Sequence, residues 1–448
     1  MFRPARRGAA RSLSHGRTWC TAAGLTTRDS DHAAALMELC ADRHYIARGR
    51  SHRDSFLRGL SCSYGPLGTE LHRNILDQWW NSVSKSNARV FGIGTLNARR
   101  DGADAGNGTL KVVDSRSLNQ VLDLQELSKE QLVQRLQKLL KSSASLTTNF
   151  LTGALDQYLP SLELVNRKLP FGLAESGPCF QTSDGRGCPA EVTQTSLVWF
   201  CSPRTSSQWL DHWARQRLQW WRKFALAPSD FSCSDISGEE EPGGKAWRGV
   251  KIVYHFPWGQ EPLETLQSRG NAELLQMHES VSAKLQCLDD HKLVVPHVVS
   301  ITGNMDRGML AYLFNSLQQQ KKEDTEQKLQ QRKVLKLHPL LAPVKVALHL
   351  GGAATVELRQ VCEGLLQDLV EAGISSWPGY LETTATSGEQ SSAKYDEMGV
   401  LFTVVIDEST LESGLLQVRS RDTTVKEIMH ISEVKRSLNR YIAAAKNV

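Results

Sequence analysis

The sequence predicts an α+β domain built on an antiparallel sheet, followed by a smaller α/β domain. In the first domain, apolar segments of strand length follow a block with helical periodicity. These segments cover residues 169–174, 191–200, 250–257 and 293–302. In the last hundred residues, strand-like and helix-like segments alternate, which is typical of a mixed sheet covered by helices. At 448 residues the chain is long enough to form both cores.

The first 27 residues differ in composition from the rest of the chain. They contain five arginines, several serines and alanines, and no acidic residue, the first being Asp29. This composition is typical of a mitochondrial transit peptide, which takes no part in the fold. The alternative is a disordered basic arm that binds nucleic acid. We favour the transit peptide, and therefore expect a protein of the mitochondrial matrix.

The overall charge does not favour binding to a polyanion. The chain has 53 Lys and Arg against 48 Asp and Glu. Without the five leader arginines, the 48 remaining cations equal the 48 acidic residues. Any nucleic acid must therefore be bound by local patches. The nine cysteines show neither a C-x-x-C pair nor the spacing of a zinc site, so we expect buried thiols, no metal and no cofactor.

Residues 33–97 predict helices followed by a short strand at 88–94. A turn is expected at Gly65–Gly68, with Thr69 as the cap of the next helix. Leu71, Ile75 and Trp79 then recur at i, i+4 and i+8, which indicates one apolar helix face.

Residues 118–165 are expected to form an inserted helical hairpin. Its first helix has a capping box, Ser128 with Gln131, and its second is expected over about 148–158, ending before Pro160. The first helix carries an apolar stripe of Leu132, Leu136, Leu139 and Leu140. Two short helices bury little area alone, so the hairpin either packs on its own domain or pairs with the same hairpin of a second subunit. We favour a four-helix bundle that forms a homodimer.

A tryptophan-rich helix is expected between the second and third of the strand segments. Its tryptophans are Trp209, Trp213, Trp220 and Trp221. They could form a stacking platform for bases, but their helical spacing favours a place in the core.

The C-terminal part predicts strands at 344–350, 400–406 and 415–420, a helix over 355–373 and a final helix over about 425–445. Gly373 is expected to end the first of these helices. Gly414 is expected to adopt a positive φ in a hairpin turn.

Three segments resemble the signature segments of class II glycyl-tRNA synthetases, and they occur in the same order. They are YGPLGTELHRNILDQWW, KLPFGLAESGPCFQ and ITGNMDRGMLAYL. From His338 to Ile442 the chain is similar to the anticodon-binding domain of glycyl-, prolyl- and threonyl-tRNA synthetases. The resemblance covers most of residues 35–445 apart from the insertion. It implies a class II synthetase-like domain over 28–336 and an anticodon-binding-like domain over 337–448.

The chain departs from the synthetase pattern where the family binds ATP. At the position of the arginine that contacts the α-phosphate stands Gln181, and the glycines of the third signature become Asn304 and Asp306. The loss of one such electrostatic donor typically raises a barrier by about 2.7–4 kcal/mol. The remaining Arg307 is expected to form a structural ion pair. These departures from the family therefore predict no amino-acid activation and no catalytic residue.

A synthetase scaffold with these departures, an inserted hairpin and a mitochondrial leader also resembles the accessory subunits of mitochondrial DNA polymerase. That resemblance implies a homodimer in the mitochondrial nucleoid that binds the catalytic subunit and double-stranded DNA and raises processivity. The alternatives are a mitochondrial glycyl-type tRNA synthetase and a tRNA-binding regulator.

Two basic clusters are candidates for contact with duplex DNA. The first, in the segment 318–339, contains Lys328, Arg332, Lys333 and Lys336, with no acidic residue from 328 to 338. On a helix, residues 328, 332 and 336 would share a face that follows a phosphate backbone. The alternative is a solvated linker. The second cluster, in the insertion, contains Arg135, Lys138 and Lys141.

Contact with the catalytic polymerase subunit is expected on the C-terminal domain. The candidates are Gly414, Arg419 and Arg421, each of which also has a purely structural interpretation.

Overall fold

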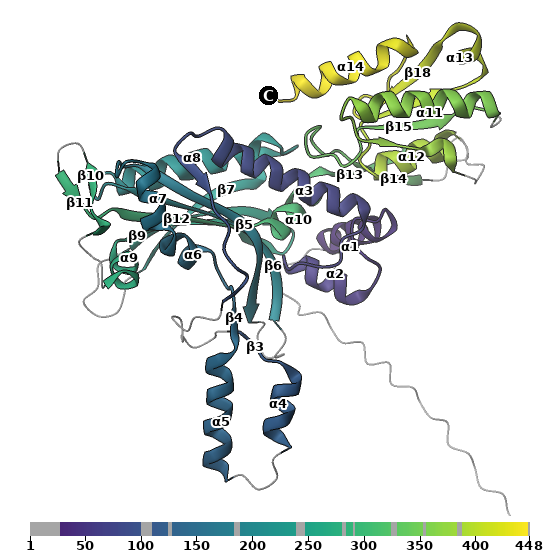
Figure 1. Ribbon diagram of the computed structural model, residues 1–448. Coiled ribbons are helices and arrows are strands. Elements are labelled where there is room, and N and C mark those ends of the chain that lie inside the picture. The colour runs from purple at the N-terminus through teal and green to yellow at the C-terminus, as the bar shows by residue number, and fades with distance from the viewer. Residues whose placement is uncertain are drawn as a thin grey trace, which may run out of the picture.

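The computed structural model describes most of the chain as one sheet-based body, a projecting helical hairpin and a C-terminal domain (Figure 1). The described residues are 27–99, 110–123, 128–182, 189–238, 247–279, 284–289, 292–323, 329–352, 355–382 and 388–446. No helix within these ranges has the length and apolar character required to cross a membrane.

The body is built on a seven-stranded sheet in the order β1-β5-β6-β12-β9-β8-β7. Its strands are β1 (Val90–Gly92), β5 (Phe171–Thr182), β6 (Pro189–Cys201), β7 (Phe231–Gly238), β8 (Trp247–Phe256), β9 (Gly259–Gly270) and β12 (His297–Asn304). Every neighbouring pair is antiparallel except β1 and β5, which are parallel. The predicted antiparallel sheet is therefore confirmed, with one parallel strand at its edge.

Helices cover both faces of this sheet. They are α1 (Thr27–Asp42), α2 (Arg50–Leu57), α3 (Pro66–Trp80), α6 (Leu151–Asp156), α7 (Tyr158–Leu164), α8 (Ser206–Lys223), α9 (Ala272–Met277) and α10 (Met305–Ser316). The largest core cluster joins α3, α8 and α10 to one sheet face, and a second cluster joins α6 and α7 to β5 and β6. The tryptophan helix is α8; Trp213, Trp220 and Trp221 are buried in the first cluster, which confirms the core interpretation.

Helix α3 carries the predicted apolar stripe but begins earlier than expected. Leu71, Ile75 and Trp79 are all fully buried. The helix starts at Pro66, not after Thr69, because a proline in the first turn lacks only an amide hydrogen that would be unpaired anyway. Gly68 is required for a close approach: a Cβ atom there would lie 1.8 Å from the carbonyl oxygen of Tyr45.

In the projecting hairpin, the helix that begins at Lys129 pairs with the helix before it in the chain and not with the expected helix over 148–158. Its elements are β2 (Ala98–Arg99), β3 (Lys111–Val112), α4 (Ser115–Leu122), α5 (Lys129–Ser142) and β4 (Ala144–Leu146). The capping box of Ser128 and Gln131 is present at the start of α5. The helix beside α5 is α4, and a three-stranded sheet in the order β2-β4-β3 joins the hairpin to the body (Figure 1).

The helix expected over 148–158 is wrong in its bounds and its role. The structure has two short helices there, α6 and α7, and Pro160 lies in the first turn of α7. Leu155, Tyr158 and Leu162 are buried against the sheet. Their apolar side chains belong to the core of the body and not to the hairpin.

The segment 318–339 forms a β-hairpin and not a helix. Strand β13 (Leu317–Glu323) pairs antiparallel with β14 (Leu329–Leu335). The helical face proposed for residues 328, 332 and 336 is therefore wrong: Lys328 lies outside the described residues, Arg332 lies in β14, and Lys336 follows the end of that strand. A second small hairpin pairs β10 (Cys287–Asp289) with β11 (Lys292–Val294).

The C-terminal domain has a five-stranded mixed sheet in the order β16-β15-β17-β18-β19. Its elements are β15 (Val346–Leu350), α11 (Val356–Glu371), β16 (Ser376–Trp377), α12 (Gly388–Glu397), β17 (Phe402–Ile406), α13 (Glu408–Ser413), β18 (Leu415–Ser420), β19 (Lys426–His430) and α14 (Ile431–Ala444). Helices α11 and α14 pack on one face of this sheet. The final helix begins six residues later than the expected Val425, because the preceding residues pair with β18 as an edge strand.

The two domains share one core. Leu335, Leu337 and Met398 belong to the same buried cluster as Tyr45 of the body. The Tyr45 hydroxyl donates to the carbonyl oxygen of Met398 at 3.0 Å, and Arg43 pairs with Glu397 at 2.6 Å. The C-terminal domain is thus held against α1 and its following loop by both apolar and charged contacts.

Candidate functional site

The end of strand β5 borders a small pocket. Gln181 is exposed near the end of β5, where the resemblance places a phosphate-binding arginine. The pocket has a volume of about 170 Å³ and is lined by Gln181, Val192, Gln194, Pro262, Leu263, Thr265, Thr302, Gly303, Asn304 and Arg307. Small-molecule sites usually measure roughly 300–1,000 Å³. The pocket is therefore small for a nucleoside triphosphate.

Arg307 lies in this pocket as a structural ion-pair partner, as expected. Its Nε lies 2.9 Å from Oε2 of Glu261. Its two terminal nitrogens donate to the carbonyl oxygens of Pro262 at 3.0 Å and Arg58 at 3.2 Å. Each nitrogen of the guanidinium thus already has a partner within the chain.

Asn304 links the third signature to the loop after α2. Its side chain accepts a hydrogen bond from the Arg307 amide at 2.9 Å, which caps α10, and donates to the Gly59 carbonyl oxygen at 2.8 Å. Gly59 has a φ of 67°, and a Cβ atom there would lie 2.7 Å from Nε of Arg307. The loop therefore packs directly on the side chains of the third signature.

Asp306, which replaces a glycine of the third signature, is turned into the protein and does not line the pocket. It is fully buried and accepts hydrogen bonds from Ser61 Oγ at 2.9 Å, the Thr193 amide at 2.5 Å and the Tyr64 hydroxyl. Nε2 of His72 lies 3.4 Å away. Burial alone would raise the pKa of Asp306, but His72 and the donors of Tyr64 and Thr193 together hold it below its usual range.

A larger depression lies beside α8, away from the end of β5. It has a volume of about 570 Å³, and its lining includes Trp213, Arg217, Trp220, Arg222 and Lys223. Its three cations already have partners in the chain. Arg217 pairs with Glu264 at 2.7 Å, Arg222 donates to the Phe231 carbonyl oxygen, and Lys223 donates to that of Lys446. We therefore assign no ligand to it.

The first basic cluster is split by ion pairs. Lys328 lies outside the described residues. Arg332 pairs with Asp396, and Lys333 lies 2.8 Å from Glu38. Lys336 is half-buried just after β14. These cations stand at the junction of the two domains, and the structure does not bring them together on one exposed face.

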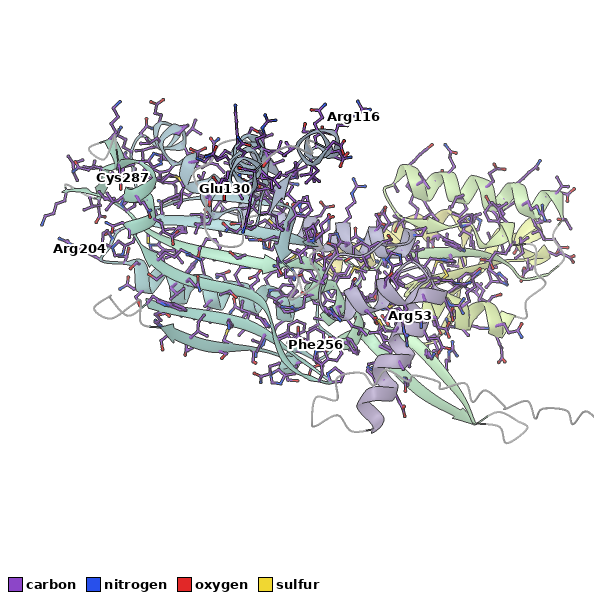
Figure 2. All side chains as sticks on the ribbon, turned by 90° about the horizontal axis from the view of Figure 1, so that it is seen from below. Arg53, Arg116, Glu130, Arg204, Phe256 and Cys287 are labelled. Carbon is purple, nitrogen blue, oxygen red and sulfur yellow. The ribbon has the colours of Figure 1, made fainter. Side chains whose placement is uncertain are left out.

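The second basic cluster is exposed on the hairpin. Arg135, Lys138 and Lys141 lie on α5 and form no ion pair with any described residue. Seen from below, Arg116 of α4 and Glu130 of α5 mark the two hairpin helices (Figure 2). The leucine stripe lies on the same helix: Leu132, Leu136 and Leu139 are half-buried, and Leu140 is 44% exposed.

Two of the three residues expected to contact a partner are buried. Arg419 makes two hydrogen bonds to Asp396, at 2.9 and 3.0 Å. Arg421 donates to the carbonyl oxygens of Leu335, Leu337 and Gly399. At 6% and 3% exposure, Arg419 is held within the C-terminal domain and Arg421 links this domain to the end of β14, so neither has a free face for a partner, which corrects the expectation.

Gly414 has the expected positive φ, at 68°, but in a different setting. It ends the short helix α13 in the left-handed conformation, and no two-residue hairpin turn is formed. A Cβ atom there would lie 2.5 Å from Nε2 of His430.

Comparisons with known proteins agree with this architecture. The anticodon binding domain family matches residues 342–440. DNA polymerase subunit gamma-2 of Bos taurus is 50% identical over 422 residues, covering 92% of this chain and 86% of that relative. The chain belongs to the DNA polymerase subunit gamma-2 family. The Xenopus laevis member, whose name includes the word mitochondrial, is 47% identical over 438 residues, which cover 96% of this chain and 92% of that relative.

The gamma-2 family membership and the synthetase resemblance are both confirmed. A glycine–tRNA ligase of Borrelia garinii is 24% identical over 407 residues, covering 83% of this chain and 89% of the ligase. The three signature segments are thus sufficient to indicate the synthetase relationship.

Sequence reasoning missed a buried ion pair in the body of this gamma-2 chain. Arg217 of α8 makes three hydrogen bonds to the carboxylate of Glu264 on β9, between 2.7 and 3.2 Å, and both side chains are buried. The Arg217 guanidinium also lies 4.3 Å from the ring centre of Trp220. Two arginines, Arg215 and Arg217, stand among the tryptophans of α8, and the sequence does not show which of them is buried; the partner of Arg217 is 47 residues away.

Proposed function

We propose that this chain is a non-catalytic accessory subunit of the mitochondrial replicative DNA polymerase. It binds the catalytic subunit and duplex DNA in the mitochondrial nucleoid, and so raises the affinity of the polymerase for DNA and its processivity. The observation that carries this proposal is the 50% identity to a DNA polymerase subunit gamma-2 over 92% of the chain.

The pocket at the end of β5 supports the absence of amino-acid activation. The third-signature arginine, Arg307, is paired with Glu261, and a neutral Gln181 stands at the first cationic position. The volume of about 170 Å³ leaves little room for ATP. A glutamine side chain can donate a hydrogen bond but cannot neutralise a phosphate.

The projecting hairpin supports a homodimer. Val133 and Leu140 on α5, and Leu122 on α4, are 44%, 44% and 55% exposed. Exposed apolar residues on a helix pair that projects from the body gain most by packing on an identical pair. We propose a four-helix bundle built from two hairpins, with the leucine stripe at its centre.

Duplex DNA is the proposed ligand of the exposed hairpin cations Arg135, Lys138 and Lys141. The segment with Lys328, Arg332, Lys333 and Lys336 stays a second candidate, although the ion pairs of Arg332 and Lys333 reduce the charge that they can offer. Contact with the catalytic subunit is proposed at the corner of Gly414, where Leu415 and Ile428 are 42% and 72% exposed. We further propose that residues 1–27, nearly all outside the described part, are a transit peptide, and that the domain boundary lies at 336/337.

Primer extension with the catalytic subunit, with and without this chain and at two salt concentrations, tests the proposal. Longer products in the presence of the chain support it. ATP–pyrophosphate exchange with any amino acid would instead support a glycyl-type synthetase. A clear preference for tRNA over duplex DNA in competition binding would support a tRNA-binding regulator.

A further inference from the structure

Helix α14 packs on the C-terminal domain by one side. Val434 and Leu438 are 1% and 3% exposed and pack in the core of that domain. The ring of Tyr441 lies 4.9 Å from that of Phe402. At its start, the side chain of His430 accepts a hydrogen bond from the Ser432 amide and caps the helix. The orientation of its outer side is therefore fixed.

The outer side of α14 is cationic. At about 100° per residue, Arg436 and Arg440 lie on the side of the helix opposite Val434 and Leu438, with Lys435 on the flank. All three cations are exposed and form no ion pair with any described residue. Glu433, in the first turn, is the only acidic residue of the helix. Three unpaired positive charges thus lie within about 7.5 Å along the axis.

The segment after α14 contacts the body. Lys446, just beyond the helix, is exposed, and its carbonyl oxygen accepts a hydrogen bond from Nζ of Lys223 at 2.8 Å. Lys223 is the last residue of α8, so this contact fixes the end of the α14 segment against the body. Figure 1 shows α14 on the outer side of the C-terminal domain with its end directed towards the body.

We propose that this α14 surface, defined by Lys435, Arg436, Arg440 and Lys446, is a docking site for the phosphate backbone of duplex DNA. The proposal rests on the proposed function, since it assumes that duplex DNA is a ligand of the chain. It places the contact on a surface that the sequence analysis did not single out.

Charge complementarity is the reason for choosing duplex DNA as the occupant. Over 7.5 Å of its axis a duplex carries about four phosphates, so the three charges that α14 presents over the same length can each have a phosphate partner. The apolar side of α14 is buried in its own domain, so the helix cannot insert into a lipid surface by its apolar residues. Lysine and arginine side chains that contact phosphates carry no sequence information, so binding should be independent of base sequence.

Neutralising the helix tests the site. The triple variant Lys435→Gln, Arg436→Gln, Arg440→Gln keeps the buried side of α14 intact. Its affinity for a random-sequence duplex is measured by fluorescence anisotropy over a series of salt concentrations, using the full mature chain. We expect weaker binding and a salt dependence of log K that is shallower by up to about 2.7, at about 0.9 per lost phosphate contact.

A matched control removes the same charge elsewhere. Lys168, Lys284 and Lys292 are also exposed, lie around the β10–β11 hairpin at the far end of the body, and can be replaced by Gln together. The control should retain the salt slope of the parent.

The possible outcomes distinguish a failure of the α14 site from a failure of the proposed function. A parent chain that binds no duplex at any salt concentration would defeat the DNA-binding part of the proposed function. A parent that binds, with a triple variant of unchanged slope and affinity, would overturn the α14 site alone. Equal losses in the triple variant and the control would also overturn it, because they would show an effect of net charge.

Discussion

Nε of Arg307 lies 2.9 Å from Oε2 of Glu261, at the edge of the small pocket beside the end of β5. This pair uses the cation that the synthetase resemblance would assign to ATP. The neighbouring Asn304 and the loop at Gly59 complete the same set of contacts. In a synthetase this arginine would be free to bind ATP; in this chain its guanidinium is paired within the fold.

The ion pair leads to a prediction about stability. Replacing Arg307 with Ala removes hydrogen bonds to the carbonyl oxygens of Pro262 and Arg58 as well as the pair with Glu261. We expect the free energy of unfolding to fall by about 1–3 kcal/mol in urea titrations. Glu261→Gln should cost less, since both side chains are partly exposed. An Arg307→Ala protein as stable as its parent would contradict the structural role.

Lys345 gives a pH prediction. Burial, and to a smaller degree the charge of Arg421, lowers its pKa from 10.5 to about 8. Between about pH 8 and 10.5 the unfolded chain therefore binds more protons than the folded chain at this site, and the stability contribution rises with pH. Below pH 8 both states are protonated and the cost of burying the charge is constant.

The variant Lys345→Met has no such titration. Its stability relative to the parent should therefore decline as the pH rises from 8 towards 10, measured by urea unfolding at each pH. The absolute difference also contains the lost hydrogen bond from Nζ to the Ala342 carbonyl oxygen, so the trend is the diagnostic quantity. A difference that does not change with pH would be evidence against a lowered pKa.

Position 414 is predicted not to tolerate a side chain. Its φ of 68° disfavours other residues, and a Cβ atom would meet Nε2 of His430 at 2.5 Å. We expect Gly414→Ala to lower the free energy of unfolding by about 1–3 kcal/mol. The control is Gly364→Ala, in the exposed face of α11 with no atom near the added Cβ, which should stabilise by roughly 0.5–1 kcal/mol. Equal effects at both glycines would contradict this account.

The exposed apolar residues of the hairpin predict its role in assembly. The double variant Val133→Lys, Leu140→Lys should shift the chain from dimer towards monomer in sedimentation experiments, because charges would be buried in the proposed bundle. Leu164→Lys is the control, since Leu164 is 68% exposed on α7, outside the hairpin. A dimer undisturbed by the double variant would exclude the hairpin as the dimer interface.

The features predictable from the sequence are those encoded within a few residues. The apolar stripe of Leu71, Ile75 and Trp79 and the capping box of Ser128 follow from helical periodicity and local hydrogen bonding. The three signature segments identified the family because each keeps its residues in consecutive positions. These local patterns also located most of the sheet.

Features that depend on distant partners were missed or misplaced. The segment around Arg332 has a charge pattern compatible with a helix, but pairing with residues 317–323 makes it a strand. The burial of Arg419 depends on Asp396, and that of Arg217 on Glu264. The strand Lys426–His430 is an edge strand whose pairing with β18 overrides a weak helical pattern. No local signal shows whether an arginine is free for a ligand or paired within the fold.

The central claim is that a synthetase-like scaffold without a working ATP site serves as a polymerase accessory subunit. It is tested most directly by primer extension limited to one binding event by a DNA trap, with the catalytic subunit alone and with this chain added. The account predicts that the added chain lengthens the products, and that a mutant of its Gly414 corner that stays folded does so less. Product lengths unchanged by a folded, dimeric chain, together with amino-acid-dependent ATP–pyrophosphate exchange, would contradict it.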